Sequence, residues 1–143
     1  MSRVTAAAIA LVVFVAFFDS FAQYPIIAPF ARELGAEAAL VGAVVAAYSA
    51  VNLVGNVVAG YLIDRFGRKR LLVLGLGSTA AAVFLYTLAA SPIQLLGIRG
   101  LHGLTAAVAA PAAFALLGDL YPRSKRGRAM GASGALIAVA AIA

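Results

Sequence analysis

Several residue types on which small proteins depend are missing or scarce in this sequence of 143 residues. It contains no cysteine, which excludes a disulfide scaffold and every cysteine-ligated metal site, and its single histidine, His102, cannot form a histidine cluster. Charged residues make up only 11% of the chain, against about 25% in soluble globular domains. Paired carboxylates, metal-ligand spacings and nucleophile–base sets are not recognisable either. We therefore expect no enzyme, no metal and no cofactor.

Apolar residues dominate instead, at 64% of the sequence, with a mean hydropathy of +1.04. A domain of this size buries only about two-thirds of the surface that its unfolded chain exposes. Water therefore cannot be the solvent for so many apolar side chains. The composition predicts an all-α integral membrane protein with the lipid bilayer as its surroundings.

Uncharged apolar runs long enough to cross about 30 Å of hydrocarbon recur along the chain. They predict four transmembrane helices and the beginning of a fifth, at residues 4–30, 38–63, 71–90, 93–118 and 129–143. The first run continues past Ala22, which favours a retained helix over a cleaved signal peptide. The fifth run is too short to span, so we expect residues 1–143 to be an incomplete part of a longer membrane domain.

The basic residues occur in alternate loops. Residues 65–70 and 123–128 are rich in arginine and lysine, whereas the opposite loops have only Arg32, next to two glutamates, and an uncharged turn at 91–92. Lys and Arg in short loops mark the cytoplasmic side of a membrane. The pattern predicts a cytoplasmic N-terminus in a multi-pass protein of the cell membrane. It also accounts for the net charge of +6 without a nucleic-acid partner.

Polar side chains inside the predicted spans are the candidate functional residues, because a charge there costs about 2.5–3.5 kcal/mol on insertion scales. They are Asp19 and Gln23 in the first helix, Asn52 and Asn56 in the second, and Arg99 and His102 in the fourth. The third helix has few polar residues and is expected to face lipid. Asp19 and Arg99 could pair as a structural ion pair, or line a water-filled path for substrate or protons, which we favour. His102 fits a packing histidine as well as a proton relay.

The second run ends in Gly60-Tyr61-Leu62-Ile63-Asp64-Arg65-Phe66-Gly67-Arg68-Lys69. Gly60 is expected to permit a close helix contact and Gly67 a tight turn. Asp64, at the carboxyl end of a helix, opposes the helix dipole and should have a cationic partner, for which Arg68 is a candidate. This string resembles the hallmark loop of the major facilitator superfamily, and every motif position matches.

Two further segments are similar to the same family. The stretch from Arg99 to Gly103 resembles its fourth-helix element, although His102 stands where glutamine is common, and residues 119–131 resemble its loop between the fourth and fifth helices. The resemblance implies part of an amino-terminal six-helix half, in which the first and fourth helices line the cavity and the third faces lipid. It also implies a cytoplasmic latch made by Asp64, Arg68 and Asp119.

The leading hypothesis is therefore a secondary active transporter of a small molecule, which works by alternating access and is coupled to protons, with efflux by antiport slightly favoured. Its partners would be the substrate, protons, the bilayer and a carboxyl-terminal half that is missing from these residues. Asp19 and Arg99 would serve coupling or substrate contact, and Asn52 and Asn56 hydrogen bonding. The alternative is a small membrane scaffold or assembly subunit without transport activity. The sequence downstream of Ala143 would separate the two.

Overall fold

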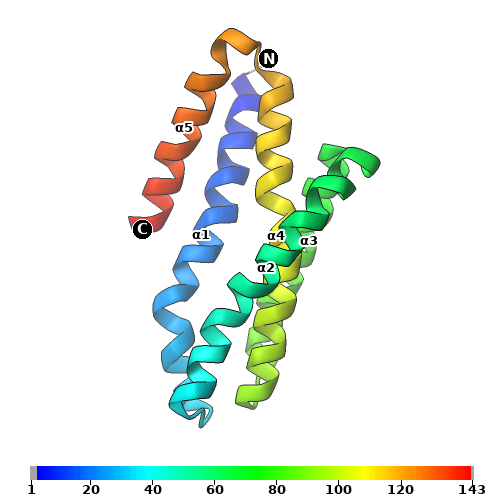
Figure 1. Ribbon diagram of the computed structural model, residues 1–143. Helices are drawn as coiled ribbons and strands as arrows, with labels where there is room; N and C mark the ends of the chain where they lie inside the picture. The colour runs from blue at the N-terminus through cyan, green and yellow to red at the C-terminus, as the bar shows by residue number, and fades with distance from the viewer. Residues whose placement is uncertain (1–2, 143) are drawn as a thin grey trace.

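The computed structural model describes residues 3–142, which are almost entirely helical (Figure 1). The helices are α1 (Arg3–Glu33), α2 (Ala38–Phe66), α3 (Arg68–Leu85), the 3-10 helix η1 (Tyr86–Leu88), α4 (Pro92–Leu120) and α5 (Arg123–Ile142). Four of them, α1 to α4, are long and apolar enough to cross a membrane. The expected all-α membrane class is confirmed. Of the fifth predicted run, residues 129–143, the structure describes residues 129–142.

Several helices extend beyond the apolar runs that predicted them. Helix α2 continues to Phe66 and α3 begins at Arg68, so that a single residue, Gly67, separates them. Helix α5 begins at Arg123, and the basic segment 123–128 forms its first turns instead of a loop. Apolar runs mark only the part of a helix inside hydrocarbon, whereas arginine and lysine are good helix formers at its polar ends.

Specific residues make the turns between the helices. Gly35 and Gly67 both have a φ of 90°, a conformation that side chains disfavour, and they lie in the turns after α1 and α2. At the start of α4 the hydroxyl of Ser91 accepts a hydrogen bond from the backbone N–H of Gln94, and Pro92 occupies the first turn. A glycine thus lies in each of the first two turns, and a capping serine followed by proline begins α4.

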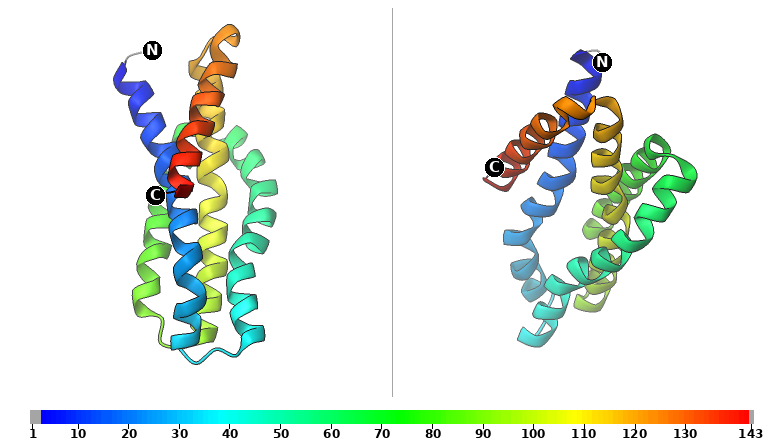
Figure 2. Two further views of the ribbon diagram at one scale, coloured as in Figure 1. Left: turned by 90° about the vertical axis from the view of Figure 1, so that its left-hand side faces the viewer. Right: turned by 45° about the horizontal axis from the view of Figure 1, so that its top comes forward.

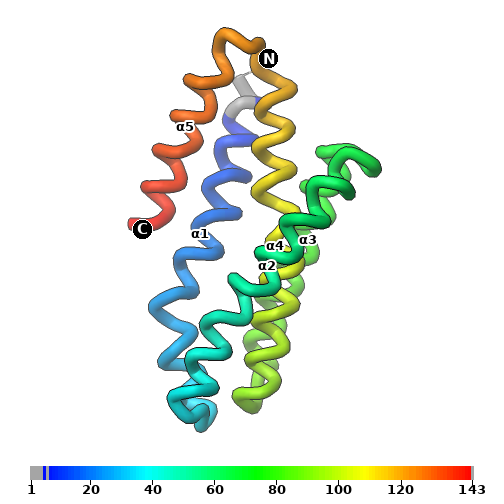
Figure 3. Tube along the Cα trace, viewed as in Figure 1, coloured from blue at the N-terminus to red at the C-terminus, as the bar shows by residue number. Residues whose placement is uncertain are grey.

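The helices alternate in direction. Figures 1 and 2 show the α1–α2 and α3–α4 turns at one end and the α2–α3 and α4–α5 turns at the other, where α1 also begins. The tube in Figure 3 follows the same path. Helix α4 packs along α2 and α3, while α1 contacts α2, α4 and α5. Both basic segments, 65–70 and 123–128, consequently belong to the same end of the molecule.

Apolar packing divides the interior into two clusters. One is near the basic end and includes Val13, Ile63 and Leu117, and the other is near the opposite end and includes Val44 and Leu95. Large apolar side chains also cover the outer surface, as expected for contact with lipid. The level between the two clusters is where α1 and α4 place their polar residues.

Glycines bring α2 and α4 close together. A Cβ atom at Gly55 would lie 2.6 Å from the Cβ of Ala107, and one at Gly103 would overlap the backbone carbonyl of Tyr48. Small residues allow this kind of backbone approach between membrane helices. Gly60, in contrast, was expected to permit a close contact, but a Cβ there would meet nothing within 4 Å. That prediction is wrong for the described residues, since Gly60 faces away from its neighbours.

Gly103→Ala is expected to force α2 and α4 apart and to destabilise the chain by about 1–3 kcal/mol, because the added methyl group overlaps backbone that cannot move alone. The midpoint of thermal loss of helical circular dichroism in detergent measures the effect. Gly97→Ala, in the same helix but in open space, is the matched control and should keep or raise the midpoint. Equal midpoints for the two variants would contradict the close contact.

Candidate functional site

The four charged or amide residues predicted on α1 and α4 do meet, between the two apolar clusters. Helix α1 supplies Asp19 and Gln23 one turn apart, and α4 supplies Arg99 and His102. The arginine is 2% exposed and the histidine 0%. Most of their polar atoms therefore bond within the protein, whereas Arg99 Nε is buried without a hydrogen-bond partner in the part of the chain that the structure describes.

Gln23 lies between the two charges. Its Nε2 donates to Asp19 Oδ1 at 2.9 Å, and its Oε1 accepts from Arg99 Nη1 at 2.7 Å. On the other side of the carboxylate, His102 Nε2 is 2.9 Å from Asp19 Oδ2. The structural alternative, in which Asp19 and Arg99 pair directly, does not match this geometry, because an amide connects the two groups.

Tyr86 closes this network. Its hydroxyl lies 3.2 Å from His102 Nδ1 and accepts a hydrogen bond from Arg99 Nη1 at 3.3 Å. Asp19, Gln23, Arg99, Tyr86 and His102 thus form a closed circuit of side chains, which we call the polar ring. The sequence analysis missed Tyr86, which follows directly on α3. The available signal was its hydroxyl, since a tyrosine in an apolar segment needs a partner.

Tyr48 of α2 covers the polar ring without belonging to it. The Arg99 guanidinium lies 4.8 Å from the centre of its aromatic ring, a cation–π distance, and its ring meets that of His102 edge-on at 5.1 Å. Its hydroxyl bonds to Ser20 Oγ at 2.8 Å. Tyr48 and Ser20 were also missed from the sequence, although both carry hydroxyl groups inside a predicted span.

The two asparagines lie on α2 beside this assembly. Asn52 donates from Nδ2 to the backbone oxygen of Gly103 at 3.0 Å, and Asn56 donates to Asn52 Oδ1 at 2.8 Å. Asn52 therefore ties α2 to α4 at the close contact described above. Neither asparagine has a hydrogen bond to the polar ring, but both line the same cavity as Asp19.

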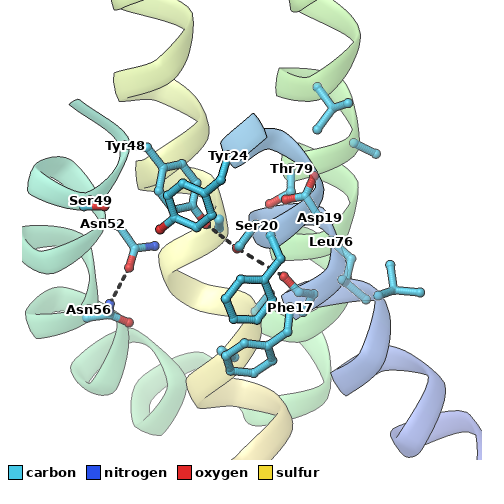
Figure 4. Close-up of a pocket in the computed structure, with 18 of the residues that line it drawn as sticks. Phe17, Asp19, Ser20, Tyr24, Tyr48, Ser49, Asn52, Asn56, Leu76 and Thr79 are labelled. Carbon is cyan, nitrogen blue, oxygen red and sulfur yellow. Dashed lines mark hydrogen bonds between the residues drawn. The ribbon is translucent and has the colours of Figure 1, made fainter. Parts of the chain in front are cut away.

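A cavity of about 740 Å³ adjoins the polar ring and is lined by all four membrane-length helices. Figure 4 shows Ser20, Tyr24 and Tyr48 facing one another within it, with Asn52 and Asn56 to one side. Asp19 also lines it, and this side chain is 18% exposed. The carboxylate is therefore a contact between the polar ring and the cavity.

Helix α3 contributes more to this interior than its composition predicted. Leu76, Thr79 and Val83 line the cavity, and Leu72 and Ala82 are buried. A Cβ atom added at Gly75 would lie 3.3 Å from Val108 of α4. Helix α3 was expected to face mainly lipid, but only its outer side does so. Its inner side lines the cavity and packs against α4.

At the basic end, Arg68 forms an ion pair with Asp119 and donates to the Ala115 carbonyl at 3.1 Å. The first turn of α3 is thereby bound to the last turns of α4. Arg68 had been a candidate partner for Asp64, and this is a correction: within residues 3–142 Asp64 is exposed and has no ion pair. The i, i+4 spacing does not carry across the Gly67 turn, where the helix direction changes.

The remaining cations of the loop motif are exposed. Arg65 donates to the Tyr61 hydroxyl at 2.7 Å, and its guanidinium lies 5.6 Å from the centre of the Phe66 ring. Lys69 has no acidic partner among the described residues. These side chains are suited to contact with water or lipid headgroups at the membrane surface.

A helical bundle with membrane-length apolar helices, a buried charged ring and a cavity beside it defines a multi-pass membrane protein with an interior polar site. The family is shown by sequence comparison. The chain matches the Major Facilitator Superfamily over residues 9–143 and belongs to this family of membrane transporters. Comparison with curated protein sequences finds no significant match.

Gln23→Met is expected to destabilise the chain by about 1–3 kcal/mol, because it leaves Asp19 Oδ1 without its amide donor and removes an acceptor from Arg99. The free energy of unfolding in mixed micelles of increasing dodecyl sulfate content measures this. Gln94→Met, at the exposed start of α4, is the matched control and should have a smaller effect, because the Ala90 N–H that it frees can bind water. A larger loss in Gln94→Met would contradict the bridging role of Gln23.

Proposed function

We propose that this chain forms the amino-terminal part of a secondary transporter that couples the movement of a small molecule to protons by alternating access. One observation carries the proposal: the polar ring, which contains the charges of Asp19 and Arg99, touches a cavity of about 740 Å³ through the Asp19 carboxylate. Ionisable residues inside membrane helices commonly mark proton and substrate routes. Membership of this family supports a transport function, and we propose coupling to protons in addition.

Charge balance gives a physical reason for coupling. With Asp19 ionised and His102 neutral, the negative charge of the carboxylate offsets the positive charge of Arg99 at a site of low dielectric. A proton on Asp19 would leave the Arg99 cation unbalanced and weaken the hydrogen bond from His102. The two protonation states therefore favour different packings of α1 against α4, and an equilibrium between conformations can shift only through such a difference.

The arrangement of the loop motif supports a gate at the basic end. The ion pair of Arg68 and Asp119 joins α3 to α4 within this chain, which leaves the exposed Asp64 for contact with a second half of the transporter. The absence of a direct Asp64 partner in residues 3–142 agrees with that arrangement. In the proposed protein, a carboxyl-terminal six-helix half completes the cavity and the gate.

Asp19→Asn in the complete transporter is expected to abolish solute movement driven by a pH gradient, because an amide cannot carry the proton. Transport in membrane vesicles is followed with ethidium as a cationic probe and fluorescein as an anionic one, in both directions. Glu37→Gln, an exposed carboxylate outside the cavity, is the matched control and should keep full activity. Unchanged transport in Asp19→Asn would remove Asp19 from the mechanism and favour a structural role for the polar ring.

The proposed location is the plasma membrane with the basic end in the cytoplasm. Because the chain has no cysteine, single cysteines report topology without background. On intact cells, a membrane-impermeant maleimide should label Ala90→Cys, between η1 and α4, and should label Ser124→Cys, at the start of α5, only after permeabilisation. The reverse pattern would contradict the orientation.

A further inference from the structure

The hydrogen positions in the polar ring can be worked out from what each group can donate or accept. An arginine side chain only donates, so at the 3.3 Å contact Tyr86 must accept from Arg99. The hydroxyl of Tyr86 has one hydrogen of its own. The neighbouring atom that can receive it is His102 Nδ1, at 3.2 Å. Nδ1 therefore acts as an acceptor and carries no proton.

A neutral histidine carries one ring proton, so with Nδ1 as the acceptor that proton is on Nε2. Nε2 lies 2.9 Å from Asp19 Oδ2, and an ionised carboxylate only accepts. The contact is satisfied when Nε2–H donates to the carboxylate. Each of the five contacts around the polar ring then has one donor and one acceptor.

The other two forms of His102 both carry a proton on Nδ1 and are disfavoured for the following reasons. A proton on Nδ1 would make Tyr86 accept twice and leave its own hydrogen without an acceptor in the polar ring. In the Nδ1–H tautomer the Nε2 lone pair would also face the carboxylate of Asp19. The doubly protonated ring would add a positive charge at a side chain that is 0% exposed, beside the Arg99 cation.

Four side chains from the neighbouring elements and from α4 itself surround His102. Asp19 faces His102 from α1, Tyr86 from η1 and Tyr48 from α2, and Arg99 lies on the same helix. The Tyr48 hydroxyl is bonded to Ser20 Oγ, so Tyr48 meets His102 only with the edge of its ring. Tyr86 is thus the tyrosine that can decide where the histidine proton lies.

We propose that Tyr86 is a positioning residue: together with the Asp19 carboxylate, its hydroxyl holds His102 in the Nε2–H tautomer, which leaves Asp19 as the group of the polar ring that exchanges a proton with the cavity. The histidine is closed off from solvent and its proton is committed to the carboxylate, whereas the carboxylate is partly exposed. The tautomer follows from hydrogen bonding alone. The proton exchange by Asp19 rests on the proposed function.

Nitrogen NMR of the chain in lipid nanodiscs, with 15N-labelled histidine and an affinity tag free of histidine, tests the tautomer directly. His102 is the single histidine of the sequence, so the label gives one pair of ring signals. Loss of this pair in His102→Gln confirms its origin. At pH 7 we expect an unprotonated Nδ1 and a protonated Nε2. A protonated Nδ1 in the unsubstituted chain would overturn the proposal, and this result needs no variant to fold.

Tyr86→Phe and Tyr48→Phe form a matched pair for the positioning role. Each removes one hydroxyl from a tyrosine whose ring packs edge-on against His102, at 5.8 and 5.1 Å. Tyr86→Phe should shift the 15N signal of the unprotonated Nδ1, because that nitrogen loses its hydrogen-bond donor while Asp19 still holds the proton on Nε2. Tyr48→Phe should leave the Nε2–H form unchanged. Identical spectra for Tyr86→Phe and the unsubstituted chain would refute the role of Tyr86.

Experiment can contradict the proposed function and the positioning role of Tyr86 independently of each other. If the tautomer is as expected but Asp19→Asn retains transport driven by a pH gradient, the positioning role of Tyr86 stands and proton exchange by Asp19 is wrong. If Asp19→Asn abolishes that transport but Nδ1 is protonated, the proposed function stands and the positioning role is wrong. In the complete transporter, Tyr86→Phe should also shift the pH dependence of transport.

Discussion

The main constraint on this structure is the burial of the charged Arg99 side chain within a membrane helix. A guanidinium cannot lose its proton in a protein, and this one is 2% exposed, so its surroundings must replace water. Gln23 and Tyr86 accept from Nη1, and the face of the Tyr48 ring lies over the planar cation. Three helical elements, α1, α2 and η1, therefore supply the groups that surround this one side chain of α4.

The close packing of α2 and α4 makes that solvation possible. Tyr48 reaches the guanidinium because its backbone lies against Gly103, where a side chain would not fit. Asn52 uses the same approach to donate to the Gly103 carbonyl. Glycine in a membrane helix costs some helix propensity. Here it gives the separation at which an aromatic ring and an amide can both reach α4.

Helical periodicity and hydropathy were sufficient to predict the four membrane helices and the faces that carry Asp19, Gln23, Arg99 and His102. They could not predict how those faces join, because the connections depend on side-chain reach across helices. The amide of Gln23 reaches Arg99 while Asp19 bonds to His102, a choice that sequence spacing leaves open. Tyr86 was missed since it follows a helix of plain composition. The loop motif predicted a cationic partner for Asp64, but the turn at Gly67 directs Arg68 to Asp119 instead.

The position of α1 explains why a proton could have a large effect on this fold. In the most apolar 18-residue stretch of α1 only 11% of the residues are buried, against 39% in the corresponding stretch of α4. Apolar packing therefore holds α1 less firmly than α4. The hydrogen bonds that join Asp19 to His102 and Gln23 to Arg99 therefore supply a larger share of the attachment of α1 to α4. Charge-assisted hydrogen bonds are about twice as strong as neutral ones. Under the proposed function, neutralising one carboxylate would weaken the attachment of α1 to α4 where apolar contact compensates least.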